Sequence, residues 1–241
     1  CMLSIVIPAH DEAPLIGATL DAIAAATAWL GDRVEVIVVD DASSDGTAEI
    51  ARARGARVVQ VAVRQIAAAR NAGAAAARGD QLLFVDADTL ANEPVVRALM
   101  AAMDRGAAGG GVAVRFHRPM PLHMRLFESV SIVLFRWFGI TPGCFLFCTR
   151  EAFEAVGGFD EQLYVTEDVA LGRALRRAGP VAILREEVWT SPRKMHTFSI
   201  GEKLRAVVSF VLSPRRTSRE RDRLDLWYGS RRHHPDDEPP G

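Results

Sequence analysis

Two aspartates separated by a single residue come directly after an apolar run. Asp86-Ala87-Asp88 follows the segment 81–85, QLLFV. Residues two apart on an extended chain point to the same side, so both carboxylates can reach one ligand. Mg²⁺ in proteins typically takes one or two carboxylates together with the phosphates of a substrate. The spacing therefore predicts a site for a divalent cation and a phosphate-containing ligand, and the alternative is a turn of solvated acids.

Two further acidic pairs occupy comparable positions. Asp40-Asp41 follows the apolar run 34–39, and Glu167-Asp168 follows Thr166 at the start of a predicted helix. In open α/β sheets, ligands bind beyond the carboxyl ends of the strands, where the first two pairs are expected to lie close together. Turn formation and helix capping are the alternatives for the pair at 40–41, and capping before Thr47 is our interpretation of Asp45.

The elements that must position these acids alternate along the first hundred residues. Apolar strand-like runs at 3–7, 34–39, 57–63 and 81–85 are separated by amphipathic or alanine-rich helical stretches. This alternation predicts a parallel sheet covered by helices on both faces. The triple glycine 109–111 lacks the spacing of a dinucleotide-binding loop and is interpreted as a turn. Later elements are predicted as helices at 95–103, 124–138 and 169–178, and as strands at 112–116, 143–148 and 181–184.

Composition restricts the class of protein. A chain of 241 residues with 49% hydrophobic content can bury one large core. The net charge of -1 gives no electrostatic case for binding nucleic acid. Three cysteines form no disulfide framework, so Cys144 and Cys148 are expected to be buried thiols in a cytoplasmic protein. We expect no spanning helix and no secretory leader, because no uninterrupted apolar stretch reaches about 18 residues.

Three more segments complete a recognisable pattern. They are Ile7-Pro8-Ala9-His10-Asp11-Glu12, Arg70-Asn71-Ala72-Gly73 and Gly157-Gly158-Phe159-Asp160. In order and approximate spacing, these segments and the acidic pairs resemble the family 2 glycosyltransferases over about residues 3–194. The resemblance implies a single-domain α/β protein of the GT-A fold, with a Rossmann-like, mostly parallel sheet flanked by helices. The expected domain covers 2–200, followed by a helical extension at 201–230 and a tail without fixed structure at 231–241.

The resemblance also implies an activity and its residues. The enzyme would move a sugar, with inversion, from a nucleoside diphosphate donor to a hydroxyl of a glycan, lipid-linked or small-molecule acceptor. Asp88 would ligate Mn²⁺ or Mg²⁺ on the diphosphate, and Asp168 would be the general base. The donor-binding residues implied are Ala9, Glu12, Asp41, Arg70, Asp86 and Asp88, and those implied to contact acceptor or diphosphate are Glu167, Arg193 and Lys194. An exposed helical arginine is the alternative for Arg70, and a solvated loop for the last two.

The proposed base has a physical difficulty. A carboxylate positioned to take the proton of an attacking hydroxyl contributes about 10² to 10⁴ in rate. Asp168 also lies in the first turn of a predicted helix, where the helix dipole stabilises the charged form and lowers the pKa. Catalysis by Asp168 therefore requires desolvation in a closed site. Simple capping of the helix is the alternative.

Two other functions compete with transfer. A nucleotidyltransferase would carry a glycine-rich basic loop after the first strand, whereas residues 8–12 are acidic and lack glycine. A catalytically silent nucleotide-sugar-binding protein is disfavoured by Asp41, Asp88 and Asp168. His10 is interpreted as a site-lining or surface residue. The chain has no Gln-x-x-Arg-Trp motif, which argues against polymer extrusion, and its apolar segments 124–138 and 204–212 are either core helices or contacts with the inner face of a membrane.

Overall fold

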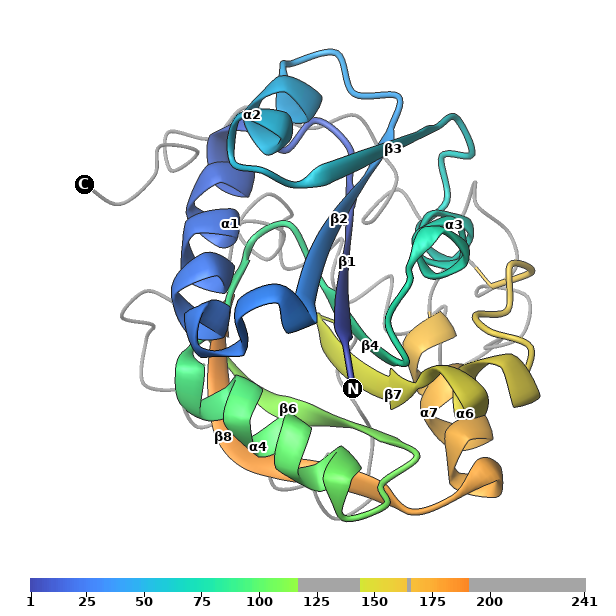
Figure 1. Cartoon of the computed structure of the whole chain (residues 1–241). Coiled ribbons are helices and arrows are strands. Elements are labelled where there is room, and N and C mark those ends of the chain that lie inside the picture. The colour runs from blue at the N-terminus through green and yellow to red at the C-terminus, as the bar shows by residue number, and fades with distance from the viewer. Residues whose placement is uncertain (117–143, 164–165, 191–241) are drawn as a thin grey trace, which may run out of the picture.

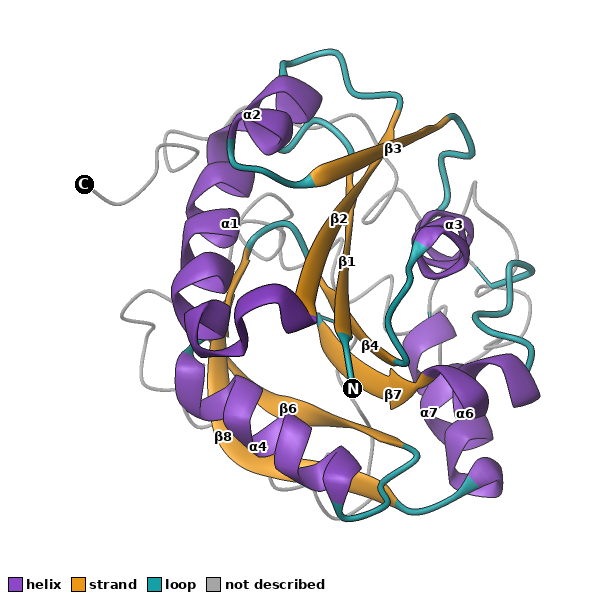
Figure 2. Ribbon diagram, viewed as in Figure 1, coloured by secondary structure: helices purple, strands orange, loops and turns teal. Residues whose placement is uncertain are grey.

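An eight-stranded sheet lies between two layers of helices (Figures 1 and 2). The computed structural model describes residues 1–116, 144–163 and 166–190. The segments 124–138 and 204–212, Arg193, Lys194 and the two C-terminal extensions lie outside the described residues. The strands are β1 (Leu3–Ala9), β2 (Val34–Asp41), β3 (Arg57–Val61), β4 (Gln81–Val85), β5 (Thr89–Leu90), β6 (Gly109–Phe116), β7 (Phe145–Thr149) and β8 (Val181–Thr190). The helices are α1 (Ala13–Thr27), η1 (Ala28–Arg33), α2 (Thr47–Ala53), α3 (Ile66–Ala76), α4 (Glu93–Asp104), α6 (Arg150–Ala155) and α7 (Glu167–Ala178).

The strand order explains where a ligand can bind. The sheet runs β3-β2-β1-β4-β7-β6-β8-β5, and the first four of these strands are parallel to one another. The chain moves outward from β1 to β2 and β3, and then β4 returns to the opposite side of β1. The order thus reverses between β1 and β4, and ligands of open α/β sheets bind beyond the carboxyl ends of the strands at such a point.

The second half of the sheet departs from the expected parallel arrangement. β7 is antiparallel to both of its neighbours, β4 and β6, and β5 is antiparallel to β8. β8 is parallel to β6 and extends to Thr190, six residues beyond the predicted end at Leu184. The short elements β5 and α6 were not predicted. The sheet remains mostly parallel, as expected, because four of its seven strand pairings are parallel.

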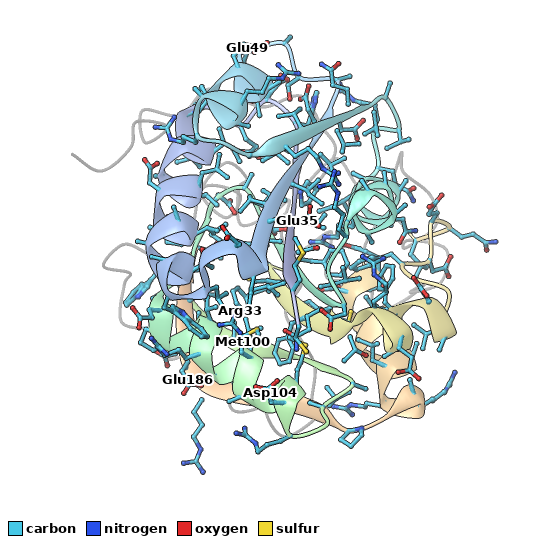
Figure 3. The ribbon with its side chains drawn as sticks, in the orientation of Figure 1. Arg33, Glu35, Glu49, Met100, Asp104 and Glu186 are labelled. Carbon is cyan, nitrogen blue, oxygen red and sulfur yellow. The ribbon has the colours of Figure 1, made fainter. Side chains whose placement is uncertain are left out.

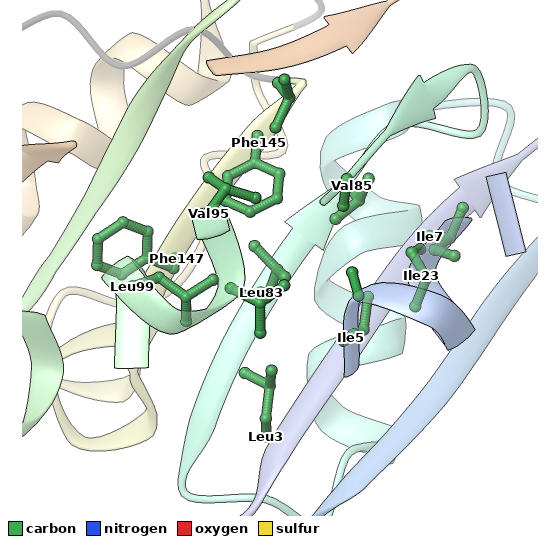
Figure 4. Close-up of a cluster of buried hydrophobic side chains, with 14 of the residues drawn as sticks. Leu3, Ile5, Ile7, Ile23, Leu83, Val85, Val95, Leu99, Phe145 and Phe147 are labelled. Atoms are coloured by element: carbon green, nitrogen blue, oxygen red, sulfur yellow. The ribbon is translucent and has the colours of Figure 1, made fainter. Parts of the chain in front are cut away.

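Alternation along each strand divides the core into two layers. On β1, Ile5 and Ile7 face the layer of α1, α2 and α4, whereas Val6 faces the layer of α3, α6 and α7. Figure 4 shows the first layer, in which Leu83 and Phe147 of neighbouring strands meet helical residues such as Val95 and Leu99. Each fully buried side chain of this size contributes about 1.5–3 kcal/mol relative to exposure. Burial on both faces explains the near-continuous apolar runs in the sequence.

The triple glycine is part of a strand, so the predicted turn at 109–111 is wrong. Gly109, Gly110 and Gly111 pair with β7 on one side and β8 on the other. A Cβ on Gly110 would collide with the carbonyl oxygen of Ala182, and one on Gly109 would lie 2.7 Å from the carbonyl oxygen of Phe147. Glycine is required here because the three backbones approach closely, which is an alternative meaning of glycine within a strand.

Polar contacts fix the end of α3, the helix that carries Arg70. Arg150 donates to the carbonyl oxygens of Ala74, Ala77 and Gly79. These carbonyl oxygens lie in the last turn of the helix and beyond its end, where the negative end of the helix dipole also stabilises a cation. Below this point, the carboxylate of Glu35 on β2 (labelled in Figure 3) accepts from the Ser4 hydroxyl at 2.6 Å. The hydroxyl in turn accepts from the Gly79 backbone N–H at 2.8 Å, so α3 is held against the sheet.

Among the residues that the structure describes, one helical stretch is long and apolar enough to cross a membrane by length and composition. It is Ala13–Arg33, formed by α1 and η1, with a mean hydropathy of 1.4 and 39% of its window buried. Its inner face, which includes Ile16, Leu20 and Ile23, belongs to the core described above. A core helix of this composition meets the same criterion, so the finding is weak evidence for a membrane segment.

Candidate active site

The residues around the reversal point adopt strained backbone conformations. Asp11, Ala42 and Arg64 follow the ends of β1, β2 and β3, and their φ angles are 50°, 55° and 50°. Thr166 precedes α7 and has a φ of 65°. Non-glycine residues with positive φ are uncommon, and such strain concentrates at functional sites where the surroundings enforce it. The four residues therefore mark one end of the sheet and the start of α7 as the candidate site.

Asp41 organises the loop between β3 and α3. Its Oδ1 accepts backbone N–H groups from Val63 at 2.8 Å and Arg64 at 2.9 Å, and its Oδ2 accepts from Gln65 at 3.2 Å. Asp41 is 6% exposed. Three of about four lone-pair positions on a carboxylate are thus used by the backbone. The neighbouring Asp40 forms the predicted turn contact, since its Oδ1 accepts from the Ser43 N–H at 3.2 Å.

The end of β1 is bound to the end of β2. Ala9 pairs with Asp40, and His10 contacts the Asp41 carbonyl oxygen through Nδ1 at 2.8 Å. Glu12 is buried at the start of α1, and its backbone N–H donates to the Thr47 hydroxyl at 2.9 Å. Residues 9–12 are therefore bound to the end of β2 and the start of α2. His10 lines the candidate site, which is one of the two positions predicted for it.

Asp45 has the capping role that its sequence position predicted. Its Oδ1 accepts the Thr47 backbone N–H at 3.1 Å at the start of α2. Its Oδ2 also accepts the Ala13 backbone N–H at 3.0 Å. These hydrogen bonds to the charged form lower the pKa of Asp45 even though partial burial opposes them.

Arg70 is a buried bridge between two acidic pairs. Its Nη2 donates to Asp86 Oδ1 at 2.8 Å, and its Nη1 donates to Glu167 Oε1 at 2.8 Å. Its guanidinium carbon lies 5.3 Å from the centre of the Phe159 ring, and the residue is 1% exposed. Burial lowers the pKa of Arg70 but the carboxylates of Asp86, Glu167 and Asp168 raise it, and the net direction is upward. The exposed helical arginine of the alternative interpretation is therefore excluded.

The pair Asp86 and Asp88 lies directly beyond β4. The Asp86 backbone N–H donates to the carbonyl oxygen of Cys144 at 3.1 Å, and Asp88 accepts from the Thr190 hydroxyl at 3.4 Å. Burial raises the pKa of the Cys144 thiol well above its ordinary value, and Asp86, Asp88 and Asp168 raise it further. Hydrogen bonds therefore tie Asp86 to the residue before β7 and Asp88 to the end of β8.

The carboxylates fit a hard divalent cation that takes most of its ligands from a substrate. Among residues 1–116, 144–163 and 166–190, no group of three His, Cys, Asp or Glu side chains could hold a metal by itself. Asp86 Oδ1 accepts from Arg70, and Asp88 Oδ1 accepts from the Thr190 hydroxyl, so both carboxylates are fixed beside the end of β4. Mg²⁺ and Mn²⁺ suit carboxylate and phosphate oxygens, and one or two protein carboxylates are enough when phosphates complete the set.

Burial changes the acidity of the pair at the start of α7. It raises the pKa of Glu167 to about 7, even though Arg70 opposes the shift, and Asp168 reinforces it. Burial also raises the pKa of Asp168, which is half-buried, against the effects of Arg70 and the Val169 backbone N–H. Desolvation thus outweighs the stabilisation expected at a helix N-terminus. This is the compensation that a base at position 168 requires.

Sequence reasoning missed three residues of this region. Asn71 and Gln65 hold the segment 158–163 against α3, and Thr190 at the end of β8 contacts Asp88. Asn71 was visible next to Arg70 in the motif, but its partner lies 88 positions away. Thr190 was missed because the predicted strand ended at Leu184, whereas β8 extends to Thr190. The cysteines were predicted as buried thiols, and Cys148 is buried whereas Cys144 is partly exposed.

The fold is that of the GT-A-type glycosyltransferases. A mannosyltransferase of Pyrobaculum calidifontis, solved with GDP-mannose and Mn²⁺, superposes with a TM-score of 0.69 at 21% identity, covering 87% of this chain and 61% of that one. A glucosyl-3-phosphoglycerate synthase of Mycobacterium tuberculosis, solved with Mn²⁺, UDP and glucosyl-3-phosphoglycerate, gives a TM-score of 0.61 at 25% identity over 88% of this chain and 79% of that one.

The family follows from the sequence comparison. The profile of glycosyl transferase family 2 matches residues 4–158, and the chain belongs to this family. A probable glycosyltransferase of Bacillus subtilis, YdaM, is 26% identical over 94% of this chain and 61% of its own length. A validoxylamine A glucosyltransferase of Streptomyces hygroscopicus subsp. jinggangensis is 37% identical over 42% of this chain. The chain spans only 25% of the length of that second relative.

Proposed function

We propose that this chain transfers a sugar from a nucleoside diphosphate donor to an acceptor hydroxyl with inversion at the anomeric carbon. Asp168 is the general base, and a divalent cation, Mn²⁺ or Mg²⁺, binds at Asp88. The family match favours transfer over the nucleotidyltransferase alternative. The observation that carries the proposal is the buried arginine that joins Asp86, beyond β4, to Glu167, next to Asp168.

The donor is expected to lie along the ends of the first, second and fourth strands. Ala9, Glu12 and Asp41 line the nucleotide side, and Asp86 and Asp88 the diphosphate side. Backbone groups and carboxylates there can bind ribose and base hydrogen-bond donors, and charged acceptors make the stronger bonds. The cation, when bound, neutralises the negative charge that develops on the departing diphosphate. Structures of similar proteins with GDP-mannose and Mn²⁺, and with UDP and Mn²⁺, support a nucleotide-sugar donor and a divalent cation as ligands.

Asp168 takes the proton of the attacking hydroxyl. A single displacement by that hydroxyl inverts the anomeric configuration. The raised pKa of Asp168 makes its carboxylate a stronger proton acceptor than a solvated aspartate, and the cause is burial. Arg70 keeps Glu167 and Asp86 in fixed positions on either side, so the base and the diphosphate site have a defined separation.

Thermal stabilisation tests donor and metal binding. The probes are UDP-glucose, UDP-N-acetylglucosamine and GDP-mannose, each with and without Mn²⁺ or Mg²⁺. A ligand at 100 times its dissociation constant stabilises by about 2.7 kcal/mol, which raises the Tm by several degrees. We expect one donor to do so only with metal, and Asp88→Ala to lose the metal dependence. Failure of every donor to shift the Tm with either metal would contradict the metal role.

A rate measurement tests the base and the stereochemistry. With the donor that binds, release of nucleoside diphosphate with water as acceptor is followed by NMR, which also shows the first anomer formed. We expect the β-anomer from an α-linked donor. Asp168→Asn should lower the rate about 10² to 10⁴-fold while the donor still shifts the Tm. The control is Asp21→Asn at an exposed pair with Arg54. Full activity of Asp168→Asn would show that another group is the base.

A further inference from the structure

Asn71 uses its whole amide on one short segment. Its Oδ1 accepts the Phe159 backbone N–H at 2.9 Å, and its Nδ2 donates to the Phe159 carbonyl oxygen at 2.9 Å and to Glu161 Oε1 at 2.8 Å. An amide group has one acceptor and two donors in this arrangement, like the edge of another strand. Asp has no donor at this position, and Ser or Thr cannot make all three contacts. The residue type is therefore specified by the segment that it holds.

Gly158 is matched to Asn71. Its φ is 72°, in the left-handed region that favours glycine. A Cβ on Gly158 would lie 2.9 Å from Asn71 Oδ1, closer than real Cβ contacts come. The second glycine of the Gly157-Gly158 turn thus leaves room for the Asn71 amide as well as allowing the turn. Glycine is therefore required at position 158 for two reasons, its positive φ and the close approach of Asn71 Oδ1.

The held segment supports Arg70 directly. The centre of the Phe159 ring lies 5.3 Å from the guanidinium carbon of Arg70. It also lies 4.9 Å from the centre of the Phe84 ring, and the two rings are at 90° to each other. Asn71 therefore fixes the backbone of Phe159, whose ring packs against the guanidinium of Arg70. Arg70 in turn holds Glu167, the neighbour of Asp168. The contacts form a continuous chain from Asn71 to the start of α7.

A second contact ties the same segment to the nucleotide side. Gln65 donates through Nε2 to the carbonyl oxygens of Glu161 and Leu163. The backbone N–H of Gln65 donates to Asp41 Oδ2 at 3.2 Å. The beginning of α3 thus connects Asp41 to the segment 158–163. Two side chains therefore hold the segment 158–163. Asn71 connects it to Arg70 and the start of α7, and Gln65 connects it to Asp41.

We propose that Asn71 is a positioning residue that sets the start of α7, and with it Asp168, by holding Phe159 and Glu161. The inference rests on the proposed function for its kinetic consequence, but its structural consequence is independent of substrate. A displacement of a reacting group by about 1 Å can cost about 10²-fold in rate. The loss of Asn71 is therefore expected to lower turnover without weakening donor binding, because no donor-side carboxylate contacts Asn71 among its hydrogen-bond partners.

Asn71→Asp is the main variant, because it keeps the shape and replaces both donors with acceptors. The new carboxylate faces the Phe159 carbonyl oxygen and the Glu161 carboxylate. Glu161→Gln, introduced together with it, removes the like charge and supplies an amide donor, so the double variant should recover part of what the single one loses. Asn92→Asp is the matched control. Asn92 caps α4 through Oδ1, a role that Asp also fills, and donates to the Glu187 carbonyl oxygen.

Hydrogen exchange of the full chain, without ligand, gives the structural readout. In Asn71→Asp, amides of 158–163 and 166–171 should exchange at least about tenfold faster than in the wild type. Amides of α4 should be unchanged. Asn92→Asp should leave exchange in 158–163 and 166–171 unchanged, and α4 should stay protected because Asp keeps the cap. Unchanged exchange in 166–171 would overturn the proposal, whatever the activity of the protein.

Kinetics give the functional readout. With the donor found in the thermal panel, kcat of Asn71→Asp should fall about 10²-fold while the donor KM stays within about twofold, and the double variant should recover about tenfold. A raised donor KM with unchanged kcat would overturn the proposal, as would failure of the double variant to recover any rate. Asp168→Asn separates the two hypotheses. If it keeps full activity, the base assignment fails, while the exchange data still decide the role of Asn71.

Discussion

The guanidinium of Arg70 lies 2.8 Å from the carboxylate of Glu167, across 97 positions of sequence, and both side chains are almost fully buried. A buried ion pair is a weak source of stability but a strong constraint on geometry, because either partner is costly to leave alone. The pair connects α3 to α7, so it fixes the position of the start of α7 relative to α3. Four consequences of this arrangement and of the surrounding backbone can be measured.

Arg70→Met should destabilise the protein by about 3 kcal/mol at pH 8, because it leaves Asp86 and Glu167 buried without the cation. Methionine retains an unbranched side chain over the Phe159 ring, so the loss reports mainly on charge. Urea unfolding measures the change. Arg52→Met is the control at an exposed pair with Glu49, 3.4 Å apart, where the effect should stay within about 0.5 kcal/mol. Equal effects of the two substitutions would contradict the bridging role of Arg70.

Glu167→Gln should make stability less dependent on pH between about 4.5 and 7. Burial raises the pKa of Glu167 from 4.5 to about 7, so the folded state binds this proton more tightly than the unfolded state. The stabilising contribution is fully present below pH 4.5 and is lost as the pH rises through 7. Unfolding free energies of the metal-free protein, measured from pH 4.5 to 8, should therefore fall with pH more steeply for the wild type than for the variant.

Glu49→Gln is the control for that comparison. Glu49 lies exposed on α2 and forms only a surface pair, so its variant should follow the wild-type curve. Parallel curves for the wild type and Glu167→Gln would show that the Glu167 carboxyl is not desolvated in solution. The remaining slope of the variant is expected to come partly from Asp168, whose pKa is also raised by burial.

Much of the sheet could be predicted because its signals are local. Apolar runs and the helices between them set the first four strands, and the acids at the end of β2 and directly after β4 were predicted at the edge of the sheet where they lie. The antiparallel insertion of β7 could not be predicted, since its pairing with β4 is decided by contacts between residues 60 to 68 positions apart. The glycines at 109–111 show the same limit, because their requirement comes from two neighbouring backbones.

The site was predictable in its residue types and not in its connections. The resemblance singled out Arg70, Asp86 and Glu167 and implied that Arg70 binds the donor. In the structure, Arg70 instead forms ion pairs with both acids at 2.8 Å. The sequence does not distinguish between these two roles of an arginine. The raised pKa of Asp168 depends on the burial of the helix start, which no local pattern encodes. Positions far apart in sequence but joined through one side chain are therefore what the structure adds.

Asp41→Asn should loosen the loop between β3 and α3. An amide has one acceptor oxygen and no charge, so it cannot accept all three backbone N–H groups that Asp41 holds. Leaving buried donors unsatisfied costs about 1–3 kcal/mol, which urea unfolding can measure. Asp40→Asn is the control, since the Asp40 side chain accepts one backbone N–H among the described residues, that of Ser43, and an amide oxygen can keep this hydrogen bond. A larger loss at Asp40 than at Asp41 would contradict this account.

Gly110→Ala should destabilise the sheet more than an alanine at a strained but open glycine. The added methyl group meets the Ala182 carbonyl oxygen of β8 and the Phe147 ring of β7, so two strands must shift to admit it. Overpacking of this kind typically costs about 1–3 kcal/mol, and backbone displacement puts Gly110→Ala at the upper end. Gly106 has a φ of 91° and nothing within 4 Å of its added Cβ, so Gly106→Ala should cost only the strain of a left-handed backbone, about 1 kcal/mol. If the two variants unfold at the same urea concentration, the close approach of β6, β7 and β8 is not what requires glycine at position 110.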